Sequence, residues 1–179
     1  LQSITIPTSV TSIGYSAFFR CSNLQSITVE STNLHFTSIE GILFSIDFAT
    51  IICFPSNHRF STYNIPTSVT SIANYTFCEC RNLQSITIPT SVTSIGDSAF
   101  YQCYILQSIN VESTNLHFAS IDGILFNKDL TTIICFPSQL QFMTYNIPTS
   151  VTSIGDSAFY LCSNLQLITI PTSVTSIGD

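Results

Sequence analysis

Charged side chains are scarce in this 179-residue chain, because Lys, Arg, Asp and Glu together make up only 8% of it. Only 4 residues are basic against 10 acidic ones, and the formal net charge is −6. A surface of this charge repels a phosphate backbone and offers no basic stripe along which a nucleic acid could lie. Nucleic acid is therefore not an expected partner.

Long apolar runs are also missing, although 45% of the residues are hydrophobic. No stretch approaches the roughly 18 uninterrupted apolar residues that a membrane-spanning helix needs. The longest runs, such as residues 132–136, have only the length of a strand. We therefore expect no membrane insertion of this segment, and we expect the apolar residues to form a core that is covered by Ser, Thr, Asn and Gln.

Internal repetition is what the sequence has in abundance. A motif Leu-Gln-(Ser/Leu)-Ile-(Thr/Asn)-(Ile/Val) begins at Leu1, Leu24, Leu83, Leu106 and Leu165, with spacings that alternate between 23 and 59 residues. The full pattern has a period of 82 residues, and 59 of the 82 paired positions are identical. We interpret the chain as a single domain, 1–179, cut from a longer array, with internal units 1–82 and 83–164 and a partial unit 165–179.

Each 23-residue coil has the marks of a stacked repeat. Leu1, Ile4 and Ile6 follow the pattern L-x-x-L-x-L, and the alternation at Ile4 and Ile6 indicates a strand with one face inward. A second short strand is expected at residues 10–13. A turn and an N-cap residue at Asp97 then predict a single helical turn. Such a coil cannot bury its apolar face alone, so neighbouring coils must stack with parallel strands.

One coil in each unit is longer. From Leu24 to the next strand start at Phe60 there are 36 residues, which is 13 more than in the short coils. The segment Gly123 to Pro137, and its copy Gly41 to Pro55, read as two short strands around a polar turn. We expect this insertion to bulge as a hairpin. The pattern leaves open whether residues 50–54 and 132–136 lie in the main sheet or beside it.

These motifs resemble a known family. The run from Ile88 to Cys103, followed by Leu106 to Ile109, is closely similar to the BspA-like leucine-rich repeats, also called the Treponema pallidum type. The segment Ser120 to Asp129 resembles the hairpin-bearing repeat of such arrays. The resemblance covers the whole chain and departs from the family only after the turn Asp, where Phe48 and Leu130 stand in place of a polar residue.

The resemblance implies a leucine-rich-repeat solenoid, a β-rich, right-handed superhelix of the α/β type. Its concave face would be a parallel sheet, and its convex side would carry short strands, single helical turns and the hairpin bulges of the 36-residue coils. It also implies a cell-surface or secreted protein of bacteria or parasitic protists, whose relatives are associated with adhesion to host proteins, matrix and other cells. Because fold alone does not fix function, this remains an analogy.

The outward positions of the main strands carry the strongest functional signal. Hydroxyl and amide side chains recur there, with a glutamate at the end of one strand in each unit, and stacking should line them up on one curved sheet. Thr also suits any exposed strand position, so a purely structural interpretation is equally open. The candidate binding face consists of Ser26, Thr28, Glu30, Thr62, Asn64, Ser85, Thr87, Ser108, Asn110, Glu112, Thr144 and Asn146.

Other residue types point to structure more than to chemistry. Four cysteines recur at one coil position and Cys53 and Cys135 are unit copies, so buried free thiols are expected. Among the histidines, His35 and His117 are copies and His58 stands alone, with no convergent nucleophile and carboxylate. The phenylalanines at the fixed position of Phe100 should be core, while the residues after them, Phe19, Tyr101 and Tyr160, should form an exposed aromatic row. No catalytic residue, cofactor or metal site is expected.

The preferred function is therefore a non-catalytic binding module, with affinity spread over many weak contacts. Regular Thr ladders also allow an alternative, the binding of ice or another crystal surface. A glycosidase is a second and much weaker alternative, since it needs two carboxylates facing each other in a cleft. Asn74, in the sequence Asn74-Tyr75-Thr76, is a glycosylation sequon. The apolar terminal coils lead us to expect end-to-end self-association.

Overall fold

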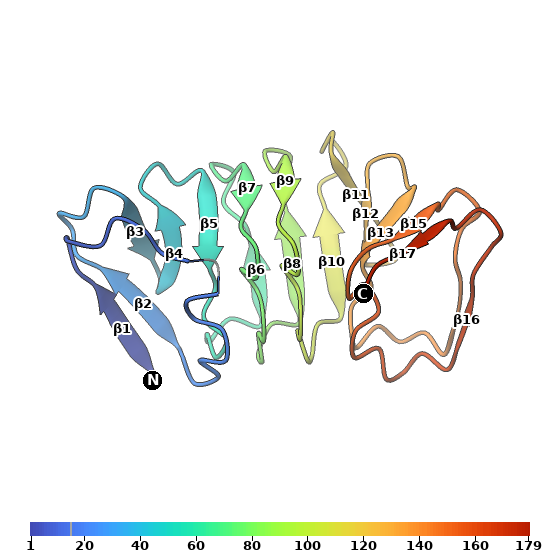
Figure 1. Ribbon diagram of the computed structural model, residues 1–179, viewed down its shortest axis with the longest axis horizontal. Coiled ribbons are helices and arrows are strands. Elements are labelled where there is room, and N and C mark those ends of the chain that lie inside the picture. Colours follow the sequence, from blue (N-terminus) through green and yellow to red (C-terminus); the bar gives the residue numbers. More distant parts are fainter. Residues whose placement is uncertain (15) are drawn as a thin grey trace.

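The computed structural model describes residues 1–14 and 16–179, and every regular element in these ranges is a β-strand. The chain coils from one end of an elongated molecule to the other, so that strands of successive coils lie side by side along its length (Figure 1). The strands are β1 (Ser3–Ile6), β2 (Ser26–Val29), β3 (Phe36–Ile39), β4 (Ile42–Ser45), β5 (Thr50–Cys53), β6 (Thr62–Asn64), β7 (Ser71–Ile72), β8 (Ser85–Ile88), β9 (Ser94–Ile95), β10 (Ser108–Val111), β11 (Phe118–Ile121), β12 (Ile124–Asn127), β13 (Thr132–Cys135), β14 (Thr144–Asn146), β15 (Ser153–Ile154), β16 (Leu167–Thr169) and β17 (Ser176–Ile177).

The first strand of each coil pairs in parallel with the equivalent strand of a neighbouring coil. In the middle of the molecule β6, β8 and β10 form a three-stranded sheet in which Tyr63, Ile86 and Ile109 are register partners. These three residues are buried, whereas the residues between them face outward, as the two-residue period of a strand requires. The predicted inward and outward assignments of these strands are confirmed.

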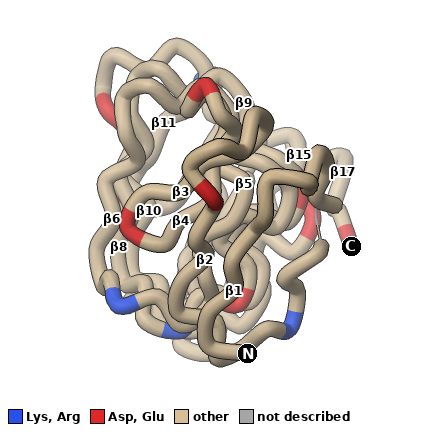
Figure 2. Tube along the Cα trace, turned by 90° about the vertical axis from the view of Figure 1, so that its left-hand side faces the viewer, with Lys and Arg blue, Asp and Glu red and all other residues tan. Residues whose placement is uncertain are grey.

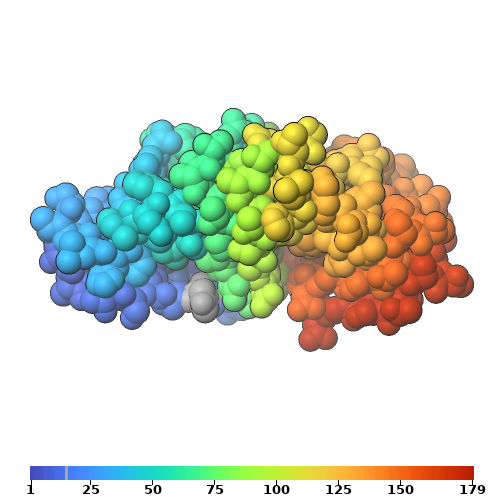
Figure 3. Space-filling view, turned by 90° about the horizontal axis from the view of Figure 1, so that it is seen from above, coloured from blue at the N-terminus to red at the C-terminus, as the bar shows by residue number. Residues whose placement is uncertain are grey.

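The leucine that starts each coil and the apolar positions that follow it fill the core. Leu24, Leu83 and Leu106 are at most 1% exposed. A Pro-Thr-Ser-Val turn then reverses the chain: the amide of Val92 donates to the carbonyl oxygen of Pro89 at 3.3 Å, and the same bond recurs in the other coils. Because each coil packs on its neighbours, the coils appear in chain order along the molecule (Figure 3).

A second set of strands lies beside the first. It comprises two five-stranded sheets, β3-β4-β5-β7-β9 and β11-β12-β13-β15-β17. In each, an antiparallel meander formed by the long coil joins in parallel to the two-residue strands of the following short coils. The predicted hairpins are therefore present as β4–β5 and β12–β13. Residues 50–53 and 132–135 belong to this second set and not to the main sheet.

The single helical turn predicted after Asp97 is absent from the described residues. Instead, residues 97–102 form consecutive turns, in which the amide of Tyr101 donates to the Ser98 carbonyl oxygen at 3.0 Å. Ser98 and Gln102 have φ angles of 52° and 56°, and residues in this left-handed region interrupt a right-handed helix. The same left-handed conformation occurs at Phe48 and Leu130, φ 57° each, in the hairpin turns.

Candidate binding surface

The outward residues of the main strands form a polar strand face. All twelve residues predicted for the candidate binding face lie outside the core, and eight of them are fully exposed. Six of the twelve lie together on the central sheet: Thr62, Asn64, Ser85, Thr87, Ser108 and Asn110. The structure thus brings half of the predicted site together on three adjacent strands.

Hydrogen bonding on this central part is sparse. The hydroxyls of Ser85 and Ser108 lie 2.9 Å apart, and the Nδ2 group of Asn110 donates to the Ser85 hydroxyl at 3.2 Å. The side chains of Thr62, Asn64 and Thr87 make no hydrogen bond to any described residue. Their donors and acceptors are therefore free for a ligand or for water.

The predicted continuous ladder is wrong, because the main sheet is broken into β1-β2, β6-β8-β10 and β14-β16. The reason is the return path of the long coil. The edge amides of β2 are already occupied: that of Ile27 donates to the Gly41 carbonyl oxygen at 2.8 Å, and that of Val29 donates to the Ser38 hydroxyl at 3.0 Å. Ile109 and Val111 of β10 have the same arrangement with Gly123 and Ser120. Ser26 and Thr28, and likewise Thr144 and Asn146, therefore lie on separate sheets.

The two glutamates of the candidate face have a structural contact. Oε2 of Glu30 accepts the amide of Thr8 at 2.9 Å, and Oε2 of Glu112 accepts the amide of Thr90 at 2.9 Å. Each carboxylate thus fixes the start of the Pro-Thr-Ser-Val turn in the preceding coil. Both side chains are nevertheless exposed and add negative charge at the strand ends.

A second row of threonines provides a useful contrast. Thr70 and Thr93, which precede β7 and β9, are exposed like the threonines of the polar strand face. Their hydroxyls, however, donate to the carbonyl oxygens of Ala49 and Thr70 at 3.3 and 3.2 Å. The same residue type is therefore internally satisfied on one side of the coil and free on the other.

Two asparagines that the sequence analysis did not single out organise the long coils. Asn115 is fully buried: its Nδ2 donates to the carbonyl oxygens of Pro89 and Val92 at 2.8 and 3.0 Å. Its Oδ1 accepts the amides of His117 and Phe118, both at 2.8 Å. Asn33 makes the same four contacts in the first unit. The motif Thr-Asn-Leu-His-Phe is thus explained by its asparagine, while the side chains of His35 and His117 are exposed.

His58 differs from the other two histidines because it is buried, at 2% exposure. Its Nε2 lies 2.8 Å from the Glu40 carbonyl oxygen, and its Nδ1 accepts the amide of Phe60 at 3.3 Å. Burial lowers the pKa of this imidazole, although the bond to the Glu40 carbonyl acts in the opposite direction. The neutral ring is a structural element, and no nucleophile and carboxylate converge on it in the described contacts.

All seven cysteines are free thiols. Cys80 and Cys103 are buried at their shared coil position, and the Sγ atom of Cys103 lies 3.0 Å from the Phe77 carbonyl oxygen. Burial raises the pKa of the Cys53, Cys78 and Cys162 thiols to about 12. Within the described ranges, no three His, Cys, Asp or Glu side chains gather as they would around a metal ion.

The aromatic row is present in part. Phe19 and Tyr160 are exposed, and the rings of Tyr101 and Tyr160 lie 4.6 Å apart. The aromatic core prediction also holds: Phe77 and Phe100 are buried and stack at 5.4 Å with an interplanar angle of 2°.

The sequon lies in the same outer turns. Asn74 is half-buried and its Oδ1 accepts the amide of Asp97 at 3.0 Å, while the hydroxyl of Thr76 is buried against three carbonyl oxygens. Glycosylation of Asn74 stays a prediction. End-to-end association also stays a prediction, although apolar residues of the terminal coils such as Leu1 and Ile177 are exposed.

Charged residues are spread around the coil. Seen along the array from its N-terminal end, Asp and Glu positions occur at several edges and the few Lys and Arg positions do not merge into a stripe on the visible side (Figure 2). One ion pair links described side chains, with Arg59 Nη2 3.8 Å from Glu40 Oε1. None of the described segments forms a helix long and apolar enough to cross a membrane.

Comparison with known proteins gives a consistent result. The family model described as the BspA type leucine rich repeat region matches six copies, over residues 1–57, 50–145 and 132–179. No curated protein matches the chain.

Three solved structures of bacterial proteins share the fold. A leucine-rich repeat protein from Eubacterium ventriosum is 26% identical and covers 100% of this chain, with a TM-score of 0.70. A leucine rich cell surface protein from Faecalibacterium prausnitzii is 29% identical over 99%, with a TM-score of 0.66. The pneumococcal vaccine antigen PcpA is 26% identical over 99%, with a TM-score of 0.61. The chain spans 50%, 48% and 36% of the lengths of these three proteins.

Proposed function

Because this chain belongs to the BspA-type leucine-rich-repeat family, we propose that it is a non-catalytic binding module of a cell-surface or secreted protein, which adheres to host proteins, matrix or cells. Two of its structural relatives are a cell surface protein and a vaccine antigen, which supports a location outside the cell. The partner is a protein that the polar strand face of the central sheet contacts.

The observation that carries this proposal is the unequal use of threonine on the two sides of the coil. On β7 and β9 the flanking threonine hydroxyls are consumed by backbone carbonyl oxygens. On β6 and β8, Thr62 and Thr87 have no such partner, and neither does Asn64. A side chain needed only for its strand propensity would not distinguish these two environments, whereas a binding surface requires free donors and acceptors.

Such a surface binds by many small contributions. A typical hydrogen bond contributes about 0.5–1.5 kcal/mol net, so a few free hydroxyls and amides give a weak single contact. Repetition of the face along an array raises the overall affinity through effective concentration, provided that the sites can be engaged together. Adhesion by repeat proteins suits this regime.

The proposal is tested by a matched pair of double variants. Thr62→Val with Thr87→Val removes two free hydroxyls from the polar strand face and keeps the strand-favouring shape. Thr70→Val with Thr93→Val does the same on the other side. Binding to immobilised, purified matrix proteins such as collagen and laminin is then measured by biolayer interferometry.

We expect the first pair to weaken binding about fivefold or more, since two lost hydrogen bonds amount to about 1–3 kcal/mol. The second pair should leave binding unchanged and lower only the unfolding midpoint, because it removes bonds within the fold. Equal affinity for both pairs, or a greater loss for the second pair, would exclude the polar strand face as the contact surface.

A further inference from the structure

The outer turns of the short coils are bonded to one another, and the long coil interrupts this row. Between coils 60–82 and 83–105, the amides of Tyr75 and Phe77 donate to the carbonyl oxygens of Asp97 and Ala99 at 3.1 and 2.8 Å. The next coil has no such turn, because after β13 it continues directly with Phe136, whose amide donates to the Ala158 carbonyl oxygen at 2.7 Å. The turn that begins at Gly96 therefore faces the turn that begins at Gly155 across the place of the missing one.

This interruption creates a cleft in the second unit, which we call the Asp97 cleft. It has an empty volume of about 720 Å³ and is open to solvent. Gly96 to Tyr101 form one wall, Gly155 to Ser157 form the opposite wall, and Ile95, Ile134 and Cys135 contribute apolar surface.

Two tyrosines and a glutamine connect the two walls at one end. The rings of Tyr101 and Tyr160 lie 4.6 Å apart, and Gln102 Nε2 donates to the Tyr160 hydroxyl at 3.1 Å. This contact spans the 58 residues between the two turns. The opening is therefore set by a defined contact, which reduces the cost of ordering the cleft on binding.

The carboxylate of Asp97 is left without a partner by the same interruption. One coil earlier, Oδ1 of the equivalent residue Asn74 accepts the amide of Asp97 at 3.0 Å. In the other wall, Oδ1 of Asp156 lies against Gly178 of the following coil. Asp97 has no equivalent turn ahead of it, and its side chain makes no hydrogen bond to the described residues. The cleft thus contains one carboxylate that no neighbouring coil satisfies.

We propose that the Asp97 cleft binds a lysine or arginine side chain of the protein partner. No basic residue lines the cleft, the carboxylate of Asp97 supplies an acceptor, and the ring of Tyr101 can face a cation. The aliphatic stem of a long basic side chain packs on apolar surface such as that of Ile134. Since it takes the ligand to be part of a protein, this assignment rests on the proposed function.

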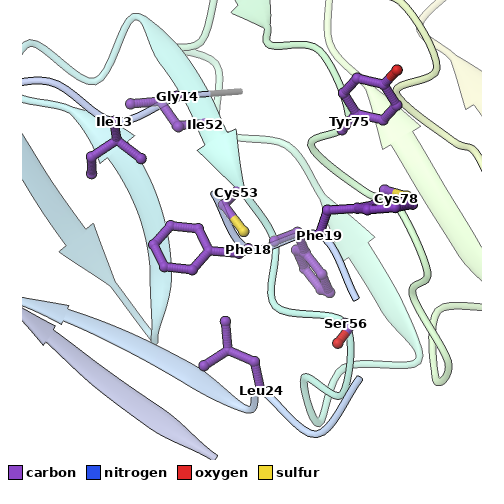
Figure 4. Close-up of a pocket in the computed structure, with 11 residues that line it drawn as sticks. Ile13, Gly14, Phe18, Phe19, Leu24, Ile52, Cys53, Ser56, Tyr75 and Cys78 are labelled. Atoms are coloured by element: carbon purple, nitrogen blue, oxygen red, sulfur yellow. The ribbon is translucent and has the colours of Figure 1, made fainter. Parts of the chain in front are cut away.

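The equivalent cleft of the first unit has different chemistry. Its described lining includes Phe18, Phe19, Tyr75 and Cys78 and contains no carboxylate. Figure 4 shows the rings of Phe18 and Phe19 beside the Cys53 thiol, with Tyr75 and Cys78 on the other side. The residue equivalent to Asp97 is residue 15, which is outside the described residues. The first cleft therefore serves as an internal comparison for an acidic site.

The test uses small probes on the intact chain. The lysine analogue N-acetyl-lysine methylamide and its uncharged counterpart N-acetyl-norleucine methylamide are titrated while backbone amide shifts are followed by NMR. We expect the lysine analogue to give saturable shifts at Asp97, Ser98 and Tyr101 and weaker shifts in the first cleft. Asp97→Asn should weaken binding about fivefold, as expected for a partly exposed ion pair. Asp156→Asn is the matched control and should change it less than twofold.

Each other result overturns the assignment. Absence of saturable shifts at these amides, equal binding of the norleucine analogue, or equal weakening by both variants would show that the cleft is not a basic side-chain site. Shifts produced by galactose or N-acetylglucosamine, and not by the lysine analogue, would identify a saccharide site instead. None of these outcomes bears on the polar strand face, whose variants are measured separately on matrix proteins.

Discussion

Replacing Asn115 by alanine is expected to destabilise the chain strongly, because this side chain is fully buried and makes four hydrogen bonds. They tie the carbonyl oxygens of Pro89 and Val92 in one coil to the amides of His117 and Phe118 in the next. Alanine would leave these four backbone groups to find water inside the structure. At about 0.5–1.5 kcal/mol net for each bond, the expected loss is about 2–6 kcal/mol.

The assay is urea unfolding followed by circular dichroism, and His117→Ala is the control. The backbone amide of His117 is bonded to Asn115, but its side chain is exposed, so its removal should change the unfolding free energy by less than about 0.5 kcal/mol. Asn33→Ala should repeat the large effect in the first unit, and the two losses should add because the sites share no partner. A loss below about 1 kcal/mol for Asn115→Ala would refute the idea that buried asparagines hold the long coils.

Three further predictions concern the core, the buried histidine and the thiols. Phe100→Ala should cost about 3–5 kcal/mol in the same unfolding assay, because the ring stacks on buried Phe77, whereas an unchanged midpoint would contradict its inward position. Burial lowers the pKa of His58, so the unfolded chain takes up its proton first and stability should fall as pH drops below about 6.5. His58→Leu copies the equivalent Leu140 and should remove that part of the pH dependence; an unaltered pH profile would argue against a neutral buried ring. Finally, Cys53, Cys78 and Cys162, with pKa values raised to about 12, should react slowly with a thiol reagent at pH 8 until the chain unfolds, and rapid labelling of the native chain would count against this burial.

Much of the fold could be predicted from the sequence because each coil repeats the same local signals. Leu24, Leu83 and Leu106 mark coil starts, and the alternation at Ile86 and Ile88 sets the inward face. The hairpin of the long coil was readable from its paired short apolar segments. These features depend on residues close together in sequence or at a fixed period.

The break in the main sheet could not be predicted in this way. It depends on where the hairpin returns, since the Gly41 carbonyl and the Ser38 hydroxyl occupy the amides of β2 that would otherwise pair with β6. The helical turn was predicted wrongly because Asp97 and Ser98 have the composition of a helix start, while contacts between coils hold Ser98 in a left-handed conformation. Asn115 was overlooked because a single asparagine shows its four partners only in the folded chain.

For the candidate surface, the residues that face outward were predicted correctly, but their unequal hydrogen bonding was not visible. Thr62 and Thr70 occur in similar sequence surroundings, and only the position of neighbouring carbonyl oxygens makes one hydroxyl free and the other bonded. Likewise, the Asp97 cleft arises from a turn that the long coil lacks, which a motif search passes over.

The most direct test of the central claim is a cross-saturation NMR experiment on the isotopically labelled chain bound to a purified matrix protein. Saturation of the matrix protein attenuates the signals of those residues of the chain that touch it. The account predicts the strongest attenuation at Thr62, Thr87 and Asn110, with little at Thr70 and Thr93. Attenuation centred on Thr70 and Thr93 instead would contradict it.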